Sequence, residues 1–178
     1  MPAQEILERS RRIENLLFDS TFWAAAHAVY CYVSLPREVQ TAGIRKRAYL
    51  EGKLLALPRV EGEDLQFHLV SDPAQPLVRS SLNIEEPPAD LPSVAPAPEP
   101  TRLGRDRALV LVPGLAFDRE CHRLGRGRGF YDRFLRRYRQ DVVAIGLCLE
   151  RQLVDGVPRD NRDMRVDAVV TEERTIRA

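Results

Sequence analysis

The residues best suited to chemistry lie in one short stretch, residues 123–135, which reads RLGRGRGFYDRFL. Three glycines alternate with arginines, and an aromatic pair and an acid follow. Glycine tolerates positive φ angles and lets the backbone approach a ligand closely, so successive N–H groups can surround an anion. Arginine adds full positive charge in a forked geometry that matches phosphate oxygens. The stretch therefore favours a loop that holds phosphate groups.

The end of this stretch predicts the start of a helix, which we expect over residues 131–139. The N-terminus of a helix carries a partial positive charge that favours a bound phosphate. Asp132 lies just inside this helix and could hold a magnesium ion directly or through water. On its own, Asp132 also fits a favourable first-turn acid near the protein surface.

The spacing of the glycines narrows the choice of function. Gly-x-Gly-x-Gly is neither the dinucleotide-binding G-x-G-x-x-G nor the Walker G-x-x-x-x-G-K-[ST], so a Rossmann dehydrogenase and a P-loop ATPase both lose support. Two alternatives to a phosphate loop stay open. One is a plain arginine-rich connection, and the other is an RNA-contacting segment in which Phe130 and Tyr131 stack on bases.

The distribution of charge bears on these alternatives. The whole chain has a net charge of +1, whereas a nucleic-acid-binding protein is usually more basic, and this argues against a nucleic-acid partner. Residues 101–140 nevertheless contain eleven arginines and four acids, a net charge of +7. Anionic small molecules are therefore plausible ligands for this region.

The composition is that of a soluble globular protein. The chain has 178 residues, of which 44% are hydrophobic and 30% charged, and this length favours one domain over residues 1–178. No apolar run reaches the ~18 residues that cross a bilayer, and no signal peptide is visible. We therefore expect a cytoplasmic monomer with no membrane partner.

Cysteine and lysine offer little chemistry. Cys31, Cys121 and Cys148 are odd in number and widely spaced, so neither a disulfide framework nor a zinc pattern emerges. Cys31 and Cys148 lie in apolar runs and are expected in the core, while the adjacent pair Cys121-His122 is too small to build a metal site. Lys46 and Lys53 are the only lysines, and Lys53 is expected to be structural or at the surface.

Strand-like and helix-like segments alternate along the chain. Buried apolar strands are predicted at 27–33, 54–57, 108–112, 142–149 and 166–171, and helices at 4–26, 38–51 and 131–139. Asp19-Ser20 can divide the first helix in two. Pro58 should end the strand predicted at 54–57. The run LQFHLV at 65–70 alternates in polarity, which suits an antiparallel or edge strand.

This pattern predicts an α/β fold of three layers, in which helices cover both faces of a mainly parallel sheet. Ligands of such sheets bind beyond the carboxyl ends of the strands, which places the loop after residue 112 at the site. Residues 87–100, PPADLPSVAPAPEP, contain six prolines and predict an extended surface connection. The connection need not divide domains, because neither side alone reads as a full core.

A longer stretch around the glycine loop has a recognisable pattern. Residues 112–135, VPGLAFDRECHRLGRGRGFYDRFL, resemble the signature of the 5-formyltetrahydrofolate cyclo-ligases, also called 5,10-methenyltetrahydrofolate synthetases. That signature runs V-P-G-x-A-F-D, a short gap, then R-L-G-x-G-x-G-Y-Y-D-R. Further matches follow the family order over about residues 10–172, namely Ser10 with Ile13, YVSLPREVQT, GKLLALPRV, LQF, IEEP and VPRDNRDMRVDAVVTE.

The resemblance implies an enzyme that couples ATP hydrolysis to ring closure of a folate. In this family the formyl oxygen of 5-formyltetrahydrofolate takes the γ-phosphoryl group, N10 attacks the activated carbon, and phosphate leaves. The products are 5,10-methenyltetrahydrofolate, ADP and phosphate. Such a site has to bring two anionic substrates together and neutralise the transferring phosphoryl group. The implied small molecules are thus the folate, ATP and Mg²⁺.

The resemblance also assigns roles by position. The residues assigned to the nucleotide phosphates are Arg123, Leu124, Gly125, Arg126, Gly127, Arg128, Gly129, Phe130 and Tyr131. The folate would contact Val33, Glu38 and residues 126–130, and Arg126, Phe130 and Tyr131 would lie beside the reacting atoms. Asp132 and Asp163 match the magnesium carboxylates. Without the resemblance, Glu38 reads as an ordinary acid at a helix N-terminus, and Asp163 as a solvated turn acid.

Two departures from the family pattern are visible. The family usually starts with a helix carrying K-x-x-L-R, whose basic residues help to bind ATP. Here the chain begins about nine residues before the match at Ser10, so we expect that basic helix to be missing. Phe130 replaces the first tyrosine of Y-Y-D, which keeps an aromatic face for stacking and removes a hydroxyl group.

Overall fold

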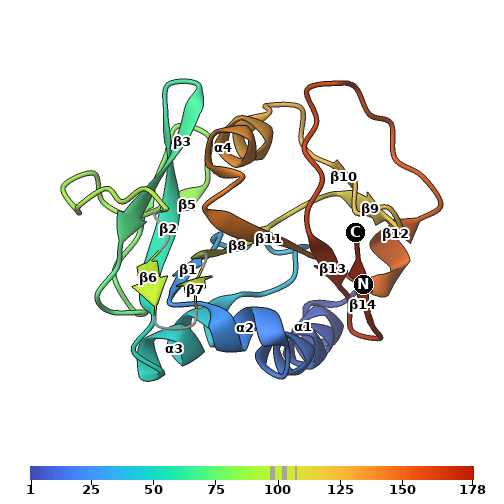
Figure 1. The fold of residues 1–178 in the computed structure, drawn as a ribbon, viewed down its shortest axis with the longest axis horizontal. Helices are drawn as coiled ribbons and strands as arrows, with labels where there is room; N and C mark the ends of the chain where they lie inside the picture. Colours follow the sequence, from blue (N-terminus) through green and yellow to red (C-terminus); the bar gives the residue numbers. More distant parts are fainter. Residues whose placement is uncertain (97–98, 102–103, 107) are drawn as a thin grey trace.

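A seven-stranded sheet organises the protein, in the order β14-β13-β11-β8-β1-β2-β3 (Figure 1). The computed structural model describes residues 1–96, 99–101, 104–106 and 108–178. The strands are β1 (Ala28–Tyr30), β2 (Leu54–Glu61), β3 (Asp64–Leu69), β8 (Ala108–Val112), β11 (Val142–Leu147), β13 (Ala168–Val170) and β14 (Thr175–Arg177). The strands from β13 to β2 are parallel, and the edge strands β3 and β14 are antiparallel to their neighbours.

Helices cover both faces of this sheet. The helices α1 (Ala3–Phe18), α2 (Thr21–Ala25) and α3 (Ala42–Leu50) lie on one face, and α4 (Phe130–Tyr138) lies on the other (Figure 1). The three-layer α/β prediction is therefore confirmed. The predicted break after Asp19 is confirmed as well, because the Ser20 hydroxyl accepts a hydrogen bond from the Trp23 N–H at 3.2 Å and caps α2.

The two faces of β8 show why the central strands read as unbroken apolar runs. Leu109 and Leu111 pack into the core beneath α1, α2 and α3, while Val110 and Val112 pack into the core beneath α4. Successive side chains of a strand point to opposite faces, and both faces are buried here. No position in such a strand can be polar without a partner.

The chain reverses its path across the sheet between β1 and β8. From β1 it passes through α3 to β2 on one side, whereas from β8 it passes through α4 to β11 on the other. Since α3 and α4 lie on opposite faces, the loops that leave the carboxyl ends of β1 and β8 diverge. A crevice at this reversal point is the common ligand site of open α/β sheets.

Several short elements surround the main sheet. A second sheet has the order β10-β9-β12, and β4 pairs with β5 and β6 with β7. Their bounds are β4 (Val78–Arg79), β5 (Glu85–Glu86), β6 (Glu99–Thr101), β7 (Gly104–Asp106), β9 (Ala116–Asp118), β10 (Arg123–Leu124) and β12 (Leu153–Val154), and a 3-10 turn, η1, spans Glu150–Gln152. Segments of two or three residues carry no periodic pattern, so the sequence did not predict them.

The prediction that Pro58 ends a strand is wrong, because β2 continues to Glu61. Pro58 pairs with Phe67, whose carbonyl oxygen accepts from Val94 N–H at 2.7 Å and so faces away from β2. On the other side, β1 pairs with β2 only as far as Ala56. The missing N–H of Pro58 therefore costs no hydrogen bond of the ladder.

The proline-rich connection runs along the outer edge of the sheet. Leu69 N–H donates to the Pro92 carbonyl at 2.8 Å, and Val94 N–H donates to the Phe67 carbonyl. Through these two hydrogen bonds the connection covers the edge of β3. Residues 97–98 of the predicted 87–100 segment lie outside the described residues. Strands from both sides of the connection belong to one sheet. In the parts of the chain that the structure describes, no helix is long and apolar enough to cross a membrane.

Candidate active site

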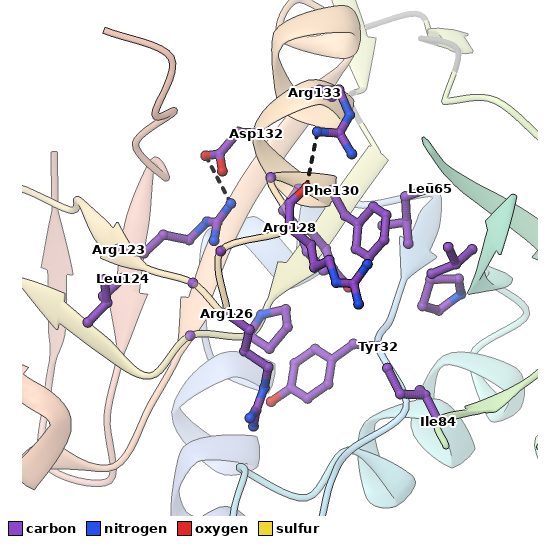
Figure 2. A pocket seen from close by; sticks show the side chains of 18 of the residues that line it. Tyr32, Leu65, Ile84, Arg123, Leu124, Arg126, Arg128, Phe130, Asp132 and Arg133 are labelled. Carbon is purple, nitrogen blue, oxygen red and sulfur yellow. Dashed lines mark hydrogen bonds and ion pairs between the residues drawn. The ribbon is translucent and has the colours of Figure 1, made fainter. Parts of the chain in front are cut away.

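A cleft of about 780 Å³ opens at the carboxyl ends of β1 and β8 (Figure 2). The glycine loop and the start of α4 line one side, and residues of β2, β3 and β5 line the other. The structure brings together in this cleft every site residue assigned from the sequence: Val33, Glu38, all of residues 123–131, Asp132 and Asp163.

The glycine loop presents unpaired backbone donors to the cleft. Gly127 and Gly129 have φ angles of 82° and 66°, a region that a residue with a side chain adopts only with strain. Within the described ranges, no backbone N–H of residues 125–132 donates a hydrogen bond to another group of the protein. Eight consecutive free donors at a loop and a helix N-terminus are suited to an anionic ligand.

Arg123, on β10, is held beneath this loop. Its side chain is only 5% exposed, and its Nη2 lies 2.9 Å from Asp132 Oδ1. The two side chains form an ion pair, but Nη2 does not make a hydrogen bond to this oxygen. The guanidinium also lies over the Tyr131 ring, 5.8 Å from its centroid. Neither Nε nor Nη2 has a hydrogen-bond partner in the described part of the chain. A buried cation with free donors is suited to a bound anion.

The two predicted magnesium ligands come from segments that contact each other. Asp132 Oδ1 accepts from Met164 N–H at 3.0 Å, which ties α4 to the segment that carries Asp163. Asp163 Oδ2 accepts from Asp160 N–H at 2.7 Å in an exposed turn. The described residues hold no group of three or more histidine, cysteine or acidic side chains placed to bind a metal. Asp132 and Asp163 are both carboxylates, a type of ligand that Mg²⁺ combines with phosphate and water oxygens.

Asp118, which has no predicted role, positions the segments that lead to Arg123 and to Asp163. Its carboxylate accepts from the N–H groups of Glu120 at 3.0 Å, His122 at 2.9 Å and Val157 at 3.3 Å. Burial would raise its pKa, yet these hydrogen bonds and the neighbouring His122 hold the pKa below its ordinary value. Asp118 thereby connects the segment just before Arg123 to the segment that leads to Asp163. The A-F-D of the quoted signature was the available signal for this residue.

Glu38 belongs to a loop that is hydrogen-bonded to itself, which explains why α3 starts at Ala42 and not at the predicted residue 38. Glu38 Oε2 accepts from Leu35 N–H at 2.9 Å, and its Oε1 lies 3.1 Å from Arg126 Nη2. The Gln40 side-chain amide donates to the carbonyls of Leu35 at 3.0 Å and Glu38 at 2.8 Å. The carboxylate is therefore fixed across the cleft from the glycine loop, with its side chain 14% exposed.

Apolar and aromatic side chains line the far side of the cleft. Pro58, Val60 and Leu65 come from the β2–β3 hairpin, and Leu82 and Ile84 come from the segment just before β5. Phe130 faces them from the start of α4 (Figure 2), and Tyr131, the next residue, also lines the cleft. Burial raises the pKa of the Tyr131 phenol well above its ordinary value, so the hydroxyl stays protonated and can donate a hydrogen bond. Such a wall suits a flat heteroaromatic ring.

The residues that the sequence placed outside the site lie outside it. Lys53 Nζ donates to the carbonyls of Trp23 at 3.0 Å and Ala26 at 2.7 Å, which confirms a structural role. Cys31 and Cys148 are buried and free, as predicted, and Cys121 is buried and free as well.

Comparison with known proteins identifies the family of this chain. The chain matches the model of the 5-formyltetrahydrofolate cyclo-ligase family over residues 1–172. It is 30% identical over 168 residues to a protein of Schizosaccharomyces pombe named probable 5-formyltetrahydrofolate cyclo-ligase, covering 87% of this chain and 79% of that protein. It is 29% identical over 182 residues to the 5-formyltetrahydrofolate cyclo-ligase of Mus musculus, covering 97% of this chain and 87% of that one.

Solved structures give the same result. The NMR structure of the 5,10-methenyltetrahydrofolate synthetase of Aquifex aeolicus superposes with a TM-score of 0.79 at 29% identity, covering 99% of this chain and 84% of that one. A synthetase from Mycoplasma pneumoniae has a TM-score of 0.70 at 18% identity, covers 97% of this chain and 90% of that one, and supports the fold alone. The match over residues 1–172 includes the glycine loop, both acids and Glu38. The chain belongs to the 5-formyltetrahydrofolate cyclo-ligase family.

Proposed function

We propose that the protein closes the ring of 5-formyltetrahydrofolate to give 5,10-methenyltetrahydrofolate, with ATP and Mg²⁺. The observation that carries this proposal is the row of unpaired N–H groups at residues 125–132, set beside the buried guanidinium of Arg123. A polyphosphate needs many donors and a nearby cation. Family membership supplies the reaction, and the cleft supplies a place for both substrates.

The nucleotide phosphates are assigned to the glycine loop. Its N–H groups would take phosphate oxygens, and Arg126 and Arg128, both exposed at the cleft, would add positive charge. Arg128 makes no hydrogen bond through its side chain within the described ranges, so its guanidinium is available. Arg126 is paired with Glu38 and would have to exchange that partner for phosphate.

Magnesium is assigned to Asp132 and Asp163. Bound there with ATP, the ion would neutralise charge on the phosphate oxygens. Asp132 is the better placed of the two, because its backbone lies in the first turn of α4, next to the donors of the glycine loop. Arg123 contacts the same carboxylate through the ion pair, which orients the Asp132 side chain.

The folate is assigned to the opposite side of the cleft. Glu38 offers carboxylate oxygens to the N–H groups of a pterin ring, and the apolar side chains of Val60, Leu65 and Phe130 can cover its faces. Tyr131 offers a hydroxyl that stays protonated. These groups would hold the formyl oxygen near the glycine loop, which converts an encounter of two substrates into a reaction within one complex.

The proposed chemistry follows from the poor leaving group in the substrate. The formyl oxygen bonds to the γ-phosphorus, and the bond to ADP breaks. N10 then forms a bond to the formyl carbon and loses its proton, while the carbon–oxygen bond breaks and phosphate departs. We assign Arg126, Phe130 and Tyr131, which line the cleft, to the surroundings of the transferring phosphoryl group. Donors fixed in advance at the phosphoryl group lower the barrier without reorganisation.

The test is a direct assay with purified protein, 5-formyltetrahydrofolate and Mg-ATP, following the absorbance of the methenyl product and the release of ADP. We expect one ADP for each methenyl product, and loss of both when magnesium is chelated. Arg123→Met serves as the matched variant, since it removes the buried cation and keeps an apolar stem. Calorimetry that shows binding of folate or nucleotide, together with no product, would identify a relative that binds without turnover and overturn the proposal.

A further inference from the structure

Arg133, at the end of the first turn of α4, contacts both sides of the cleft. Its Nη1 donates to the carbonyl oxygen of Arg128 at 3.1 Å, and its Nη2 donates to the carbonyl oxygen of Glu63. Nε lies 3.4 Å from Asp64 Oδ1. Figure 2 shows the guanidinium above Phe130, with the contact to the glycine loop drawn as a dashed line. One side chain thus joins the glycine loop to the β2–β3 hairpin.

On the loop side, the contact fixes a peptide plane in the phosphate-binding segment. Arg128 lies between Gly127 and Gly129, which both have positive φ angles. The peptide between Arg128 and Gly129 is trans, so anchoring its carbonyl at Arg133 directs the N–H of Gly129 the opposite way. The packing is close, because a Cβ atom placed on Gly129 would lie 2.9 Å from Arg133 Nη1.

On the hairpin side, the contact holds the turn. Glu61 pairs with Asp64, which leaves Gly62 and Glu63 as a two-residue loop, and Gly62 has a φ angle of 63°. The strands that this turn joins carry Val60 and Leu65, two members of the apolar wall. Whatever moves the turn therefore moves the surface assigned to the folate ring.

We infer that Arg133 is a positioning residue that couples the nucleotide side of the site to the folate side. The inference rests on the proposed function, which assigns phosphates to one side and the pterin to the other. Ordering of the glycine loop by a nucleotide would hold the Arg128 carbonyl, and through Arg133 the hairpin, in the arrangement that receives the folate. The forked shape of the guanidinium is essential to this role. Its two Nη atoms donate to two separate carbonyl oxygens, which a single ammonium group cannot reach at the same time.

A linkage experiment tests the coupling. Calorimetry would give the Kd of 5-formyltetrahydrofolate with and without a non-hydrolysable ATP analogue plus Mg²⁺, and the Kd of the analogue with and without the folate. The ratio of the two Kd values has to be the same from either direction, which checks the measurement. The proteins are wild type, Arg133→Met, which keeps an unbranched apolar stem over Phe130, and Arg133→Lys, which keeps the charge. Arg137→Met is the control, because Arg137 is exposed one turn further along α4.

We expect the ratio to be at least about 5 in wild type and in Arg137→Met, and below about 2 in both Arg133 variants, while each ligand alone binds within about threefold of wild type. An unchanged ratio in the Arg133 variants would overturn the inference, and so would a wild-type ratio near one. Should Arg133→Met fail to fold, Arg133→Lys carries the same expectation. Wild-type protein that binds neither ligand would overturn the proposed function itself, and with it this inference.

Discussion

Replacement of Asp132 tests whether a predicted magnesium ligand also supports the fold. Its place near the start of a helix suggested a surface acid, so that Asp132→Ala would damage activity more than folding. In the structure the side chain is only 17% exposed, pairs with the buried Arg123 and accepts from Met164 N–H. We therefore expect a clear loss of stability even without ligands.

The size of that loss follows from these two contacts. Removing one partner of a buried ion pair costs about 3–5 kcal/mol. Asp132→Asn keeps an amide oxygen that can accept from Met164 N–H, and the position is partly exposed to solvent. We therefore expect the free energy of unfolding to fall by about 2 kcal/mol, which lowers the melting temperature by ~4–8 °C in a chain of this length. Asp132→Ala also leaves the Met164 N–H unpaired, which adds about 1–3 kcal/mol.

Thermal and denaturant unfolding of the ligand-free proteins would measure both losses. The double variant Arg123→Met with Asp132→Asn removes both charges, and we expect it to be more stable than the sum of the single variants predicts, by at least about 1 kcal/mol. A melting temperature within about 2 °C of wild type for Asp132→Ala would refute the argument. If the stability losses of the two single variants simply add up in the double variant, the contact between Arg123 and Asp132 contributes nothing to stability.

Three further predictions concern the walls of the cleft and the residue that positions them. Gly127→Ala places a side chain at a φ angle of 82° with open space around it, so it should cost about 1–2 kcal/mol and raise the KM for ATP, whereas Gly52→Ala, at 68° and outside the cleft, should show the same stability loss with unchanged kinetics. Glu38→Gln keeps an acceptor for Leu35 N–H and loses the charge, so steady-state assays should show a KM for the folate about tenfold higher with little change for ATP. The lowered pKa of Asp118 means that its stabilisation is present above the unfolded pKa of about 4 and is lost as pH falls through the folded pKa. Melting curves should then show a gap between wild type and Asp118→Asn that is wide at pH 7 and narrow at pH ~3, and a constant gap would contradict this.

The parallel direction of the main strands could be predicted because these strands are buried on both faces. ALVLV at β8 and VVAIGL at β11 are unbroken apolar runs of the length of a strand, and a helix-like segment lies between them. These features determine a parallel pair with a crossover helix. The glycine loop could be predicted for a different reason: its motif lies within a few consecutive residues, and its position after β8 places it at the carboxyl edge of the sheet.

The residues that were missed act through contacts between distant segments. Asp118 binds an N–H group 39 positions away, and Arg133 binds a carbonyl 70 positions away. Both residues stand in the signature at residues 112–135, but no period or spacing in the sequence connects either one to its partner. The prediction that α3 begins at residue 38 was wrong for a related reason. The hydrogen bonds of Glu38 and Gln40 compete with helix formation, so the helix begins at Ala42.

The central place of β8 determines how the chain can fold during synthesis. β1, β2 and β3 leave the ribosome long before β8, yet β1 needs β8 as its second neighbour. Until residue 112 has emerged, β1 offers an open edge whose residues are apolar on both faces. Pairing over such a separation is slow, and an exposed edge invites association with other chains. We expect a nascent chain stalled before β8 to be the species that chaperones hold and proteases cut.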